Sequence, residues 1–286
     1  MQITPNEIDA VCDLIHDLCG IYLDESKAYL IENRLADIVK KCQCSNYLDL
    51  VRLVREQCSV TLKQDIVNAI TTQETLFFRD GSPFEALKNK ALPEMIDSKA
   101  SAINPKRLRM WSAACSSGQE PYSIAMTICE LIPSAWTWDI QILATDISDS
   151  AIAKASRGRY AQYEVERGLP NDFRDRYFTK HNEEWIIKDE IRSMVAFRRL
   201  NLHEPFETLG PFDIIFCRNV AIYFTPEQRR SLFERLSDRL VTNGYLFVGS
   251  SESLSDYGER FQPLSHCRSV FYQPNVDHTQ GARSGS

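Results

Sequence analysis

Polar side chains follow three apolar stretches of the sequence, at the points where each stretch ends. Asp146 ends the run ILATD, Asn201 closes the stretch VAFRRLN, and Asn219 comes two residues after the run FDIIFC. If these runs are parallel strands, their carboxyl ends meet at the sheet edge where open α/β folds bind ligands. A carboxylate there can hold ribose hydroxyls, and an asparagine amide both donates and accepts hydrogen bonds. The three residues therefore predict a site for a nucleotide-type ligand.

Each of these residues also has a simpler interpretation. Asp146 could cap the helix that follows it, although Ser148 or Asp149 could serve as the cap instead. A single asparagine after a strand is more often a turn residue than a ligand. The ribose role of Asp146 is favoured because the predicted sheet edge also carries both asparagines and a bend of small residues.

That bend lies in the stretch LRMWSAACSSGQEPYSIAM, residues 108–126. We expect a strand over 108–113, a bend over 114–118, and a helix opened by Glu120 and Pro121. Proline suits the first helical position because its missing N–H would be unpaired there anyway. Backbone N–H groups at a helix start can face an anionic group, and small residues let a ligand approach closely. The stretch therefore predicts one wall of the ligand site.

The bend carries a single glycine, Gly118, and lacks the G-x-G-x-x-G fingerprint of dinucleotide-binding proteins. Close approach of a backbone to a pyrophosphate requires the second glycine of that fingerprint. The bend therefore disfavours a nicotinamide-dependent oxidoreductase and suits an adenosyl ligand without phosphate. S-adenosylmethionine (SAM), an adenosine joined to an amino-acid tail through a sulfonium, is such a ligand.

The composition of the 286 residues excludes several classes of protein. With a net charge of −6 and a pI near 5.5, the chain lacks the basic character that general nucleic-acid binding requires. No apolar run approaches the roughly 18 residues of a membrane span, and the N-terminus lacks the features of a signal peptide. The nine cysteines show no paired framework. We expect a reduced, cytoplasmic protein without a structural metal site, which neither binds nucleic acid nor inserts into a membrane.

The spacing of apolar residues divides the chain into segments that would position the candidate site residues. Residues 1–75 carry apolar residues at helical spacing, which predicts a helical N-terminal domain. Residues 76–107 read as a linker and a connecting helix. Residues 108–274 alternate strand and helix patterns, which predicts an α/β fold with a doubly wound, mostly parallel sheet. Within them, residues 157–194 read as an inserted antiparallel β-subdomain, and the polar tail 275–286 is expected to be disordered.

Local signals set two of the helix boundaries. A helix is predicted over residues 83–99. Another is predicted over 225–242, because Asn243-Gly244 should end it before a strand over 244–250.

Several blocks of the sequence resemble the signature blocks of one enzyme family. The blocks WSAACSSGQEPYSIAM, ATDIS, LNL, FDIIFCRNVAIYF, GYLFVGSSESL and TTQETLFFRD look like those of the CheR-type chemotaxis receptor methyltransferases, in order over residues 5 to 272. The resemblance implies a helical N-terminal domain, a Rossmann-like SAM-dependent methyltransferase domain and a small β-subdomain. It also implies methyl transfer from SAM to glutamate side chains of membrane chemoreceptors, with S-adenosylhomocysteine (SAH) as product.

The resemblance also assigns site residues by motif. It places nine residues at cofactor-contacting positions, namely Gln73, Thr75, Arg79, Glu120, Asp146, Asn201, Leu202, Asn219 and Val220. Gln73, Thr75 and Arg79 fall in the block that joins the two domains and closes over the cofactor. Gln73 departs from the family pattern, in which an asparagine is expected.

A glutamate substrate requires no general base, because its side chain has a pKa of about 4.3 and is ionised at neutral pH. The motif blocks accordingly contain no Ser-His-Asp or Cys-His arrangement. The sulfonium activates the methyl group, so the protein mainly supplies orientation and desolvation. We expect Arg79 to orient a carboxylate of cofactor or substrate. Tyr223 either forms a hydrogen bond near the acceptor or is a core aromatic, and the sequence favours neither.

The second predicted helix carries Arg34, Lys40 and Lys41, and the family uses basic residues of this helix against receptor helices. Arg34 and Lys41 are seven residues apart and share one helix face, so a basic stripe could meet a glutamate-rich receptor region. The alternative is an ordinary solvated face. The implied partner is the helical cytoplasmic domain of membrane chemoreceptors, and the enzyme is expected to be a monomer.

The predicted insertion resembles the β-subdomain that, in some members of the family, docks a pentapeptide at the receptor's C-terminus. Those members carry a glycine-containing loop between its strands. The corresponding loop here, KHNEEW, is shorter and contains no glycine. We therefore expect this protein to work without a pentapeptide tether.

Three other functions share some of these features. A nucleic-acid amino-methyltransferase would carry an Asn/Asp-Pro-Pro-aromatic block after the fourth strand, where this chain has Arg-Asn-Val. A SAM-dependent methyltransferase acting on another protein or a small carboxylate would leave the helical domain and the insertion unexplained. A non-catalytic receptor-binding adaptor is disfavoured by the intact Arg79, Asp146 and Asn219.

Overall fold

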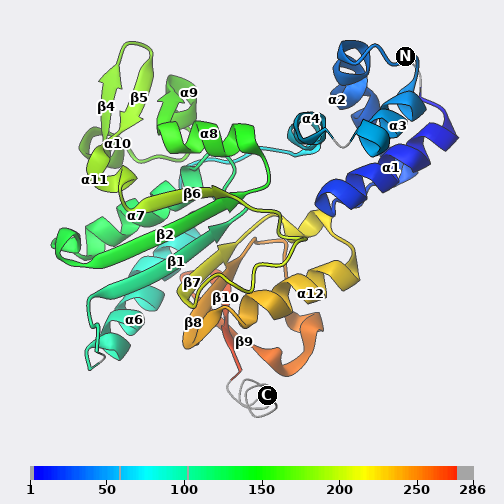
Figure 1. Ribbon diagram of the computed structural model, residues 1–286. Helices are drawn as coiled ribbons and strands as arrows, with labels where there is room; N and C mark the ends of the chain where they lie inside the picture. Colours follow the sequence, from blue (N-terminus) through cyan, green and yellow to red (C-terminus); the bar gives the residue numbers. More distant parts are fainter. Residues whose placement is uncertain (1–2, 58, 102, 276–286) are drawn as a thin grey trace.

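The computed structural model describes residues 3–57, 59–101 and 103–275 (Figure 1). Its N-terminal part is a helical bundle with the elements α1 Pro5–Cys19, η1 Glu25–Lys27, α2 Ala28–Lys41, α3 Tyr47–Gln57 and α4 Val60–Ile70. The bundle has its own apolar core, which includes Val11, Leu35 and Leu50. Of the tail predicted to be disordered, residues 276–286 lie outside the described residues.

The carboxylate of Glu7 holds the start of this bundle together. One of its oxygens accepts a hydrogen bond from the backbone N–H of Thr4 (2.8 Å), as in a capping box. The other accepts from the backbone N–H of Tyr47 (3.0 Å), the first residue of α3. The same side chain therefore caps α1 and ties it to α3.

The connecting helix predicted over 83–99 contains a wider π turn in its middle. Its parts are α5 Ser82–Ala86, η2 Leu87–Ala91 and α6 Leu92–Lys99. Pro93 accounts for the turn, because proline lacks the N–H that bonds four residues back and its ring clashes with that carbonyl. A π turn changes the local hydrogen-bonding pattern and relieves this conflict. The segment still packs as a unit, since Phe84, Leu87 and Leu92 are buried against the sheet.

The C-terminal part is built on a sheet with strand order β6-β2-β1-β7-β8-β10-β9. The strands are β1 Arg107–Ala113, β2 Asp139–Asp146, β6 Val195–Arg199, β7 Phe212–Cys217, β8 Leu240–Val248, β9 Phe261–His266 and β10 Ser269–Pro274. Strands β6, β2, β1, β7 and β8 run parallel to one another. The sheet continues with β10, which is antiparallel to β8, and with β9, which is antiparallel to β10. The strand order reverses between β1 and β7, which is a topological switch point. The predicted doubly wound α/β fold is confirmed.

Helices cover both faces of this sheet (Figure 1). They are α7 Gln119–Leu131, α8 Asp149–Arg157 and α12 Pro226–Ser237, with the short 3₁₀ helices η3 Ala135–Thr137, η4 Ala221–Tyr223 and η5 Ser255–Arg260. Successive residues of β1 serve opposite faces. Met110 joins the core that contains α5 to α7, and Trp111 joins the core that contains α12.

Two predicted boundaries are wrong. Helix α7 begins at Gln119, so Pro121 occupies the third helical position and not the first. Helix α12 ends at Ser237, and residues predicted as its last turn belong to β8, which starts at Leu240. Asn243-Gly244 thus lies inside a strand. A Cβ on Gly244 would sit 3.0 Å from the carbonyl oxygen of Asp213, so this glycine permits close strand approach where the β7–β8 register shifts.

The insertion forms a small antiparallel sheet in the order β3-β5-β4, beside α8 (Figure 1). Its elements are β3 Arg159–Ala161, α9 Gln162–Glu166, α10 Asn171–Tyr177, β4 Phe178–His181, β5 Glu184–Ile187 and α11 Asp189–Arg192. Phe77 of the linker packs edge-on against Tyr160 and Phe178, with ring centroids 5.0 and 5.5 Å away. The linker is therefore anchored against the subdomain.

Across the described ranges, none of the helices combines the length and the apolar character that crossing a membrane would require.

Candidate functional site

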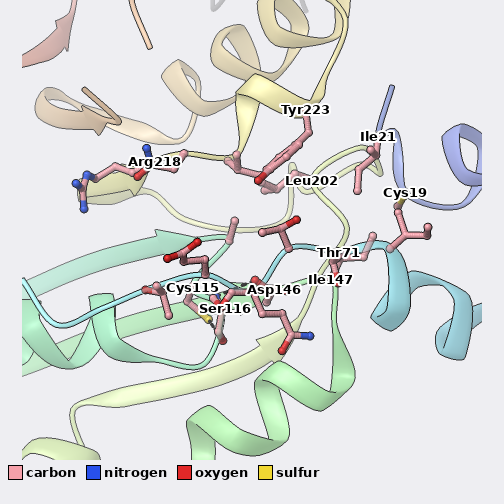
Figure 2. Close-up of a pocket in the computed structure, with 18 of the residues that line it drawn as sticks. Cys19, Ile21, Thr71, Cys115, Ser116, Asp146, Ile147, Leu202, Arg218 and Tyr223 are labelled. Atoms are coloured by element: carbon pink, nitrogen blue, oxygen red, sulfur yellow. Dashed lines mark hydrogen bonds between the residues drawn. The ribbon is translucent and has the colours of Figure 1, made fainter. Parts of the chain in front are cut away.

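A cavity lies where the carboxyl ends of the parallel strands face the helical bundle (Figure 2). It holds about 1130 Å³ of space, counting the part open to solvent. All nine residues predicted to contact the cofactor line it, together with Tyr223. Cys19 and Ile21, from the end of α1 and the segment after it, form the opposite wall. The cavity therefore spans the switch point of the sheet, the position at which open α/β folds bind ligands.

The bend after β1 is compact because its backbone alternates in handedness. Ala114, Ser116 and Gly118 all have positive φ angles (61°, 50° and 96°). A Cβ on Gly118 would lie 2.9 Å from the Cβ of Ala155 and 3.0 Å from the hydroxyl of Tyr160. The single glycine of the bend is thus required by conformation and by space.

Asp146 closes the floor of the cavity beside this bend. One carboxylate oxygen accepts from the N–H of Ser116 (2.8 Å), and the other accepts from the N–H of Ser148 (2.9 Å). Helix α8 is capped by Ser148, whose hydroxyl accepts from the N–H of Ala151 (3.2 Å), so Asp146 is not the cap. Burial raises the pKa of Asp146. Its oxygens keep lone pairs that ribose hydroxyls could use.

Glu120 is held by polar partners within the site. It accepts from the hydroxyl of Ser112 (2.7 Å) and from Arg218 (3.0 Å). Burial raises the pKa of Glu120, and the positive charge of Arg218 opposes this shift. Arg218 also pairs with Asp80 (2.6 Å) and donates to the backbone carbonyl of Arg79 (3.0 Å), while its side chain is 1% exposed. Arg218 thus connects the end of β7 to the linker and to Glu120.

Arg218 was not predicted as a site residue, although it lines the cavity. A signal was present, because it directly follows the fully buried β7, where a charged side chain needs a partner. Glu252 was missed as well. It lies after β8 and accepts from the backbone N–H of Asn219 (2.8 Å).

Four residues of the segment 73–79 line the cavity, namely Gln73, Glu74, Thr75 and Arg79. The side-chain amide nitrogen of Gln73 donates to the hydroxyls of Ser148 (2.9 Å) and Ser150 (3.3 Å), and the backbone carbonyl of Gln73 accepts from the hydroxyl of Ser116 (3.1 Å). Gln73 thus fastens the linker to α8 and to the bend. Arg79 lines the cavity and donates to the backbone carbonyl of Glu74 (3.1 Å).

Tyr223 is partly buried and lines the cavity, so its ring is not enclosed in a core. It approaches the cavity from the side opposite Asp146 (Figure 2). Its backbone carbonyl accepts from the N–H of Tyr22 (2.8 Å), which ties the bundle to the 3₁₀ turn η4. Its hydroxyl is the group that could reach an acceptor.

Asn201 has much of its amide engaged by the protein. Its side-chain oxygen accepts from the N–H of His203 (3.0 Å), and its nitrogen donates to the carbonyl of Leu18 (3.3 Å). It therefore forms a turn and links that turn to α1, in addition to lining the cavity. Leu202 is buried beside it.

The three basic residues of α2 do not line the cavity. Arg34 donates to the carbonyls of Ala69 (3.3 Å), Ile70 (2.7 Å) and Thr71 (3.0 Å), so it satisfies the C-terminal end of α4. Lys41 pairs with Asp65 (2.8 Å), and Lys40 lies 3.7 Å from Asp37; both lysine side chains are more than 70% exposed. The structure thus separates Arg34, which holds two helices together, from the two solvated lysines.

The donor set of the cavity fits SAM. A half-buried aspartate at the end of β2 suits ribose hydroxyls, and the bend offers no glycine-rich cradle for a phosphate. The carboxylates of Glu120 and Asp146 on the walls suit a ligand that carries positive charge. Among the described residues, no group of three or more His, Cys, Asp or Glu side chains is arranged to hold a metal ion.

Comparison with known proteins covers both parts of the chain. The family model described as "CheR methyltransferase, SAM binding domain" matches residues 73–270, and "CheR methyltransferase, all-alpha domain" matches residues 6–71. The chain is 42% identical to "Chemotaxis protein methyltransferase Cher2" of Pseudomonas putida, over 89% of this chain and 93% of that protein. It is 39% identical to "Chemotaxis protein methyltransferase 1" of Vibrio cholerae, over 96% of this chain and 98% of that protein.

These matches agree with the order of the elements, since the all-alpha model covers the bundle and the SAM-binding model covers the linker and the sheet as far as the start of β10. The chain belongs to the CheR family of chemotaxis protein methyltransferases and is a SAM-dependent methyltransferase.

Proposed function

We propose that this protein transfers the methyl group of SAM to glutamate side-chain carboxylates of membrane chemoreceptors. The observation that carries the proposal is that Arg79, Asp146 and Asn219 line one cavity, at the switch point of the sheet. In this proposal residues 1–75 form the receptor-recognition domain and residues 108–274 the transfer domain, joined by the linker and connecting helix over 76–107.

Bound SAM supplies a methyl group that its sulfonium makes electrophilic. Asp146 would hold the ribose hydroxyls, because its buried oxygens retain acceptor capacity after the two backbone hydrogen bonds. The other eight cofactor positions would surround the remainder of the ligand. Arg79 would orient the carboxylate of the substrate glutamate or of the cofactor tail, since a guanidinium pairs with carboxylates in bidentate fashion.

The reaction needs no general base from the chain. The substrate carboxylate is ionised at neutral pH and is itself the nucleophile. The residues that line the cavity include no histidine among those described, and His16 and His203 pack against one another at the junction of the bundle and the sheet. Enclosing the nucleophile and the methyl group away from water is the main contribution expected of the cavity.

Receptor recognition is proposed for α2. Lys40 and Lys41 are exposed and would face a glutamate-rich helix of the receptor's cytoplasmic domain, a contact that charge complementarity favours. Arg34 is proposed as a further substrate contact, which it would make with the donors that its hydrogen bonds to the end of α4 leave free. The enzyme is proposed to act as a monomer.

The β-subdomain is proposed to work without a receptor pentapeptide tether. Strands β4 and β5 are joined directly by Asn182 and Glu183, and Asn182 adopts a positive φ of 56°. A two-residue turn of this kind leaves little loop to close over a peptide. This supports the proposal that the receptor is held through the helical domain.

The experiment is methyl transfer from tritium-labelled SAM to an isolated chemoreceptor cytoplasmic domain. Label on the receptor is expected, and it should be lost when the methylatable glutamates of the receptor are replaced by alanine. Receptor binding without any transfer would instead identify an adaptor and contradict the proposal.

A further inference from the structure

The loop after β8 carries a carboxylate with an unusual set of partners. Among the residues that the structure describes, the oxygens of Glu252 accept four backbone N–H groups. One oxygen accepts from Gly249 (2.7 Å) and Asn219 (2.8 Å). The other accepts from Ala221 (2.9 Å) and Val220 (3.2 Å). A carboxylate is suited to this arrangement because it only accepts hydrogen bonds and has four lone-pair sites.

These contacts fix the backbone of one cavity wall. Asn219, Val220 and Ala221 are consecutive, so the carboxylate sets the orientation of three successive peptide planes. Asn219 has a positive φ of 57°, a conformation that costs energy for residues other than glycine. Glu252 offsets this cost by accepting hydrogen bonds from the N–H of Asn219 and from the N–H of the next residue, Val220.

Gly249 completes the arrangement by leaving space. A Cβ on Gly249 would lie 2.7 Å from the amide nitrogen of the Asn219 side chain and 2.7 Å from a carboxylate oxygen of Glu252. The Asn219 amide therefore packs directly against the Gly249 backbone. The loop after β8 thus sets both the side-chain and the main-chain position of Asn219, which itself follows a different strand, β7.

We propose that Glu252 is a positioning residue that prepares the Asn219–Val220 wall for the methyl donor. It acts through the backbone of that wall and lies outside the set of residues that line the cavity. The proposal rests on the placement of the donor against Asn219 and Val220 given above. Its physical reason is preorganisation, since a wall that is already ordered costs less to bind against.

The test compares SAH binding by calorimetry in the wild type, Glu252→Gln, Glu252→Asp and Gly249→Ala. In Glu252→Gln, an amide nitrogen replaces one acceptor oxygen and faces backbone N–H groups, so SAH should bind about ten- to a hundredfold more weakly. Glu252→Asp keeps the charge but shortens the reach, and should lie between wild type and Glu252→Gln. Gly249→Ala retains the Glu252 side chain but crowds both its carboxylate and the Asn219 amide, and should also weaken SAH binding. Ser251→Ala, at an exposed neighbour, is the matched control.

A purely structural role would lower the melting temperature without a selective kinetic effect. The proposal instead predicts that the KM for SAM rises in Glu252→Asp and Gly249→Ala, while the KM for the receptor stays unchanged. Wild-type SAH affinity in Glu252→Asp and Gly249→Ala would overturn the proposal even if Glu252→Gln fails to fold. A wild-type protein that binds no SAH would contradict the cofactor placement itself, and the positioning role with it.

Discussion

Arg79 contributes a guanidinium to the cavity wall at the point where the linker crosses the strand ends. A guanidinium has five N–H donors, so its contact with the carbonyl of Glu74 leaves donors for a carboxylate. We expect Arg79→Ala to reduce methyl transfer by about a hundredfold, the scale of losing a charge-assisted contact in an enclosed site. Tritium transfer and thermal melts check this, and the melting temperature should not change. Arg52→Ala, on the surface of the bundle, is the control, and wild-type turnover in Arg79→Ala would exclude the role.

Asp146 gives the site a pH dependence. Burial raises its pKa, so the ligand-free carboxyl takes up a proton at a higher pH than a free aspartic acid, whose pKa is about 3.9. Its ionised form therefore costs folding free energy at neutral pH, a cost that disappears as the pH falls through the raised pKa. A ligand that donates hydrogen bonds to the ionised form binds in competition with this proton.

SAH affinity is accordingly expected to fall as the pH drops from neutral into the range where Asp146 protonates. Calorimetry over this range measures it, and Asp146→Asn should bind SAH more weakly and with a flatter pH profile. Glu120 also lines the cavity with a raised pKa, so some dependence should remain. Asp139→Asn, an exposed change at the start of β2, is the control. Equal pH profiles for wild type and Asp146→Asn would contradict the ribose role.

Residues were predictable from sequence where a strand leads directly into them. Asp146 ends β2, Asn219 comes two residues after β7, and both line the cavity. Arg218 and Glu252 were missed for a physical reason, because their importance depends on tertiary partners. The pairing of Arg218 with Asp80 joins positions 138 residues apart, and Glu252 binds backbone groups about thirty residues before it.

The basic residues of α2 separate into two kinds once the helices are packed. Arg34 satisfies carbonyls at the end of α4, so Arg34→Ala should destabilise the fold by about 1–3 kcal/mol, the range for hydrogen bonds to a charged donor. The double change Lys40→Ala and Lys41→Ala removes only surface ion pairs, which contribute little to stability.

In the double variant Lys40→Ala and Lys41→Ala, we expect the KM for the receptor to rise several-fold, while kcat and the melting temperature stay unchanged. The rise in KM should be smaller at high salt, because salt screens the charges. Steady-state kinetics at two salt concentrations measure this. Lys106→Ala, just before the amino end of β1, is the matched control. If the double variant has a wild-type KM, the lysines form an ordinary solvated face.

The bounds of a strand or helix were predictable where its apolar residues in the sequence match its buried residues in the structure. Strands β1 and β7 begin and end within one residue of the predicted ranges, because both are buried along most of their length. The end of α12 was misplaced because Asn-Gly is a common stop signal in isolation. Pairing of Leu240 with Phe212 extends β8 backwards through that dipeptide, a tertiary contact that outweighs the local preference.

At the scale of the whole molecule, the sequence predicted two parts but not how they meet. Hydrogen bonds across the junction include Tyr22 N–H to the carbonyl of Tyr223 (2.8 Å), Asn201 to the carbonyl of Leu18 (3.3 Å), Gln228 to His16 (2.8 Å), and the hydroxyl of Ser148 to Asn68 (2.7 Å). Hydrophobic patterns contain no information on such pairs. The sheet side of the cavity was therefore predictable, whereas the wall formed by Cys19 and Ile21 was not.

The short turn between β4 and β5 leads to a prediction for the intact protein. Calorimetry with a receptor C-terminal pentapeptide should detect no micromolar binding, because Asn182 and Glu183 leave no loop to enclose it. A receptor domain lacking the pentapeptide should be methylated as fast as the complete one. Micromolar binding of the peptide, or slower methylation of the shortened receptor, would contradict tether independence.

We propose above that this cavity directs the methyl group of SAM to a carboxylate oxygen, which makes a methyl ester. The most direct measurement is the alkali lability of the product, with receptor labelled from tritiated SAM, washed, and exposed to mild base. The label is expected to leave the receptor as volatile methanol, and the yield of methanol should fall in Arg79→Ala. Label that stays on the receptor through base treatment would mean that nitrogen, sulfur or another atom had been methylated, and would contradict the account.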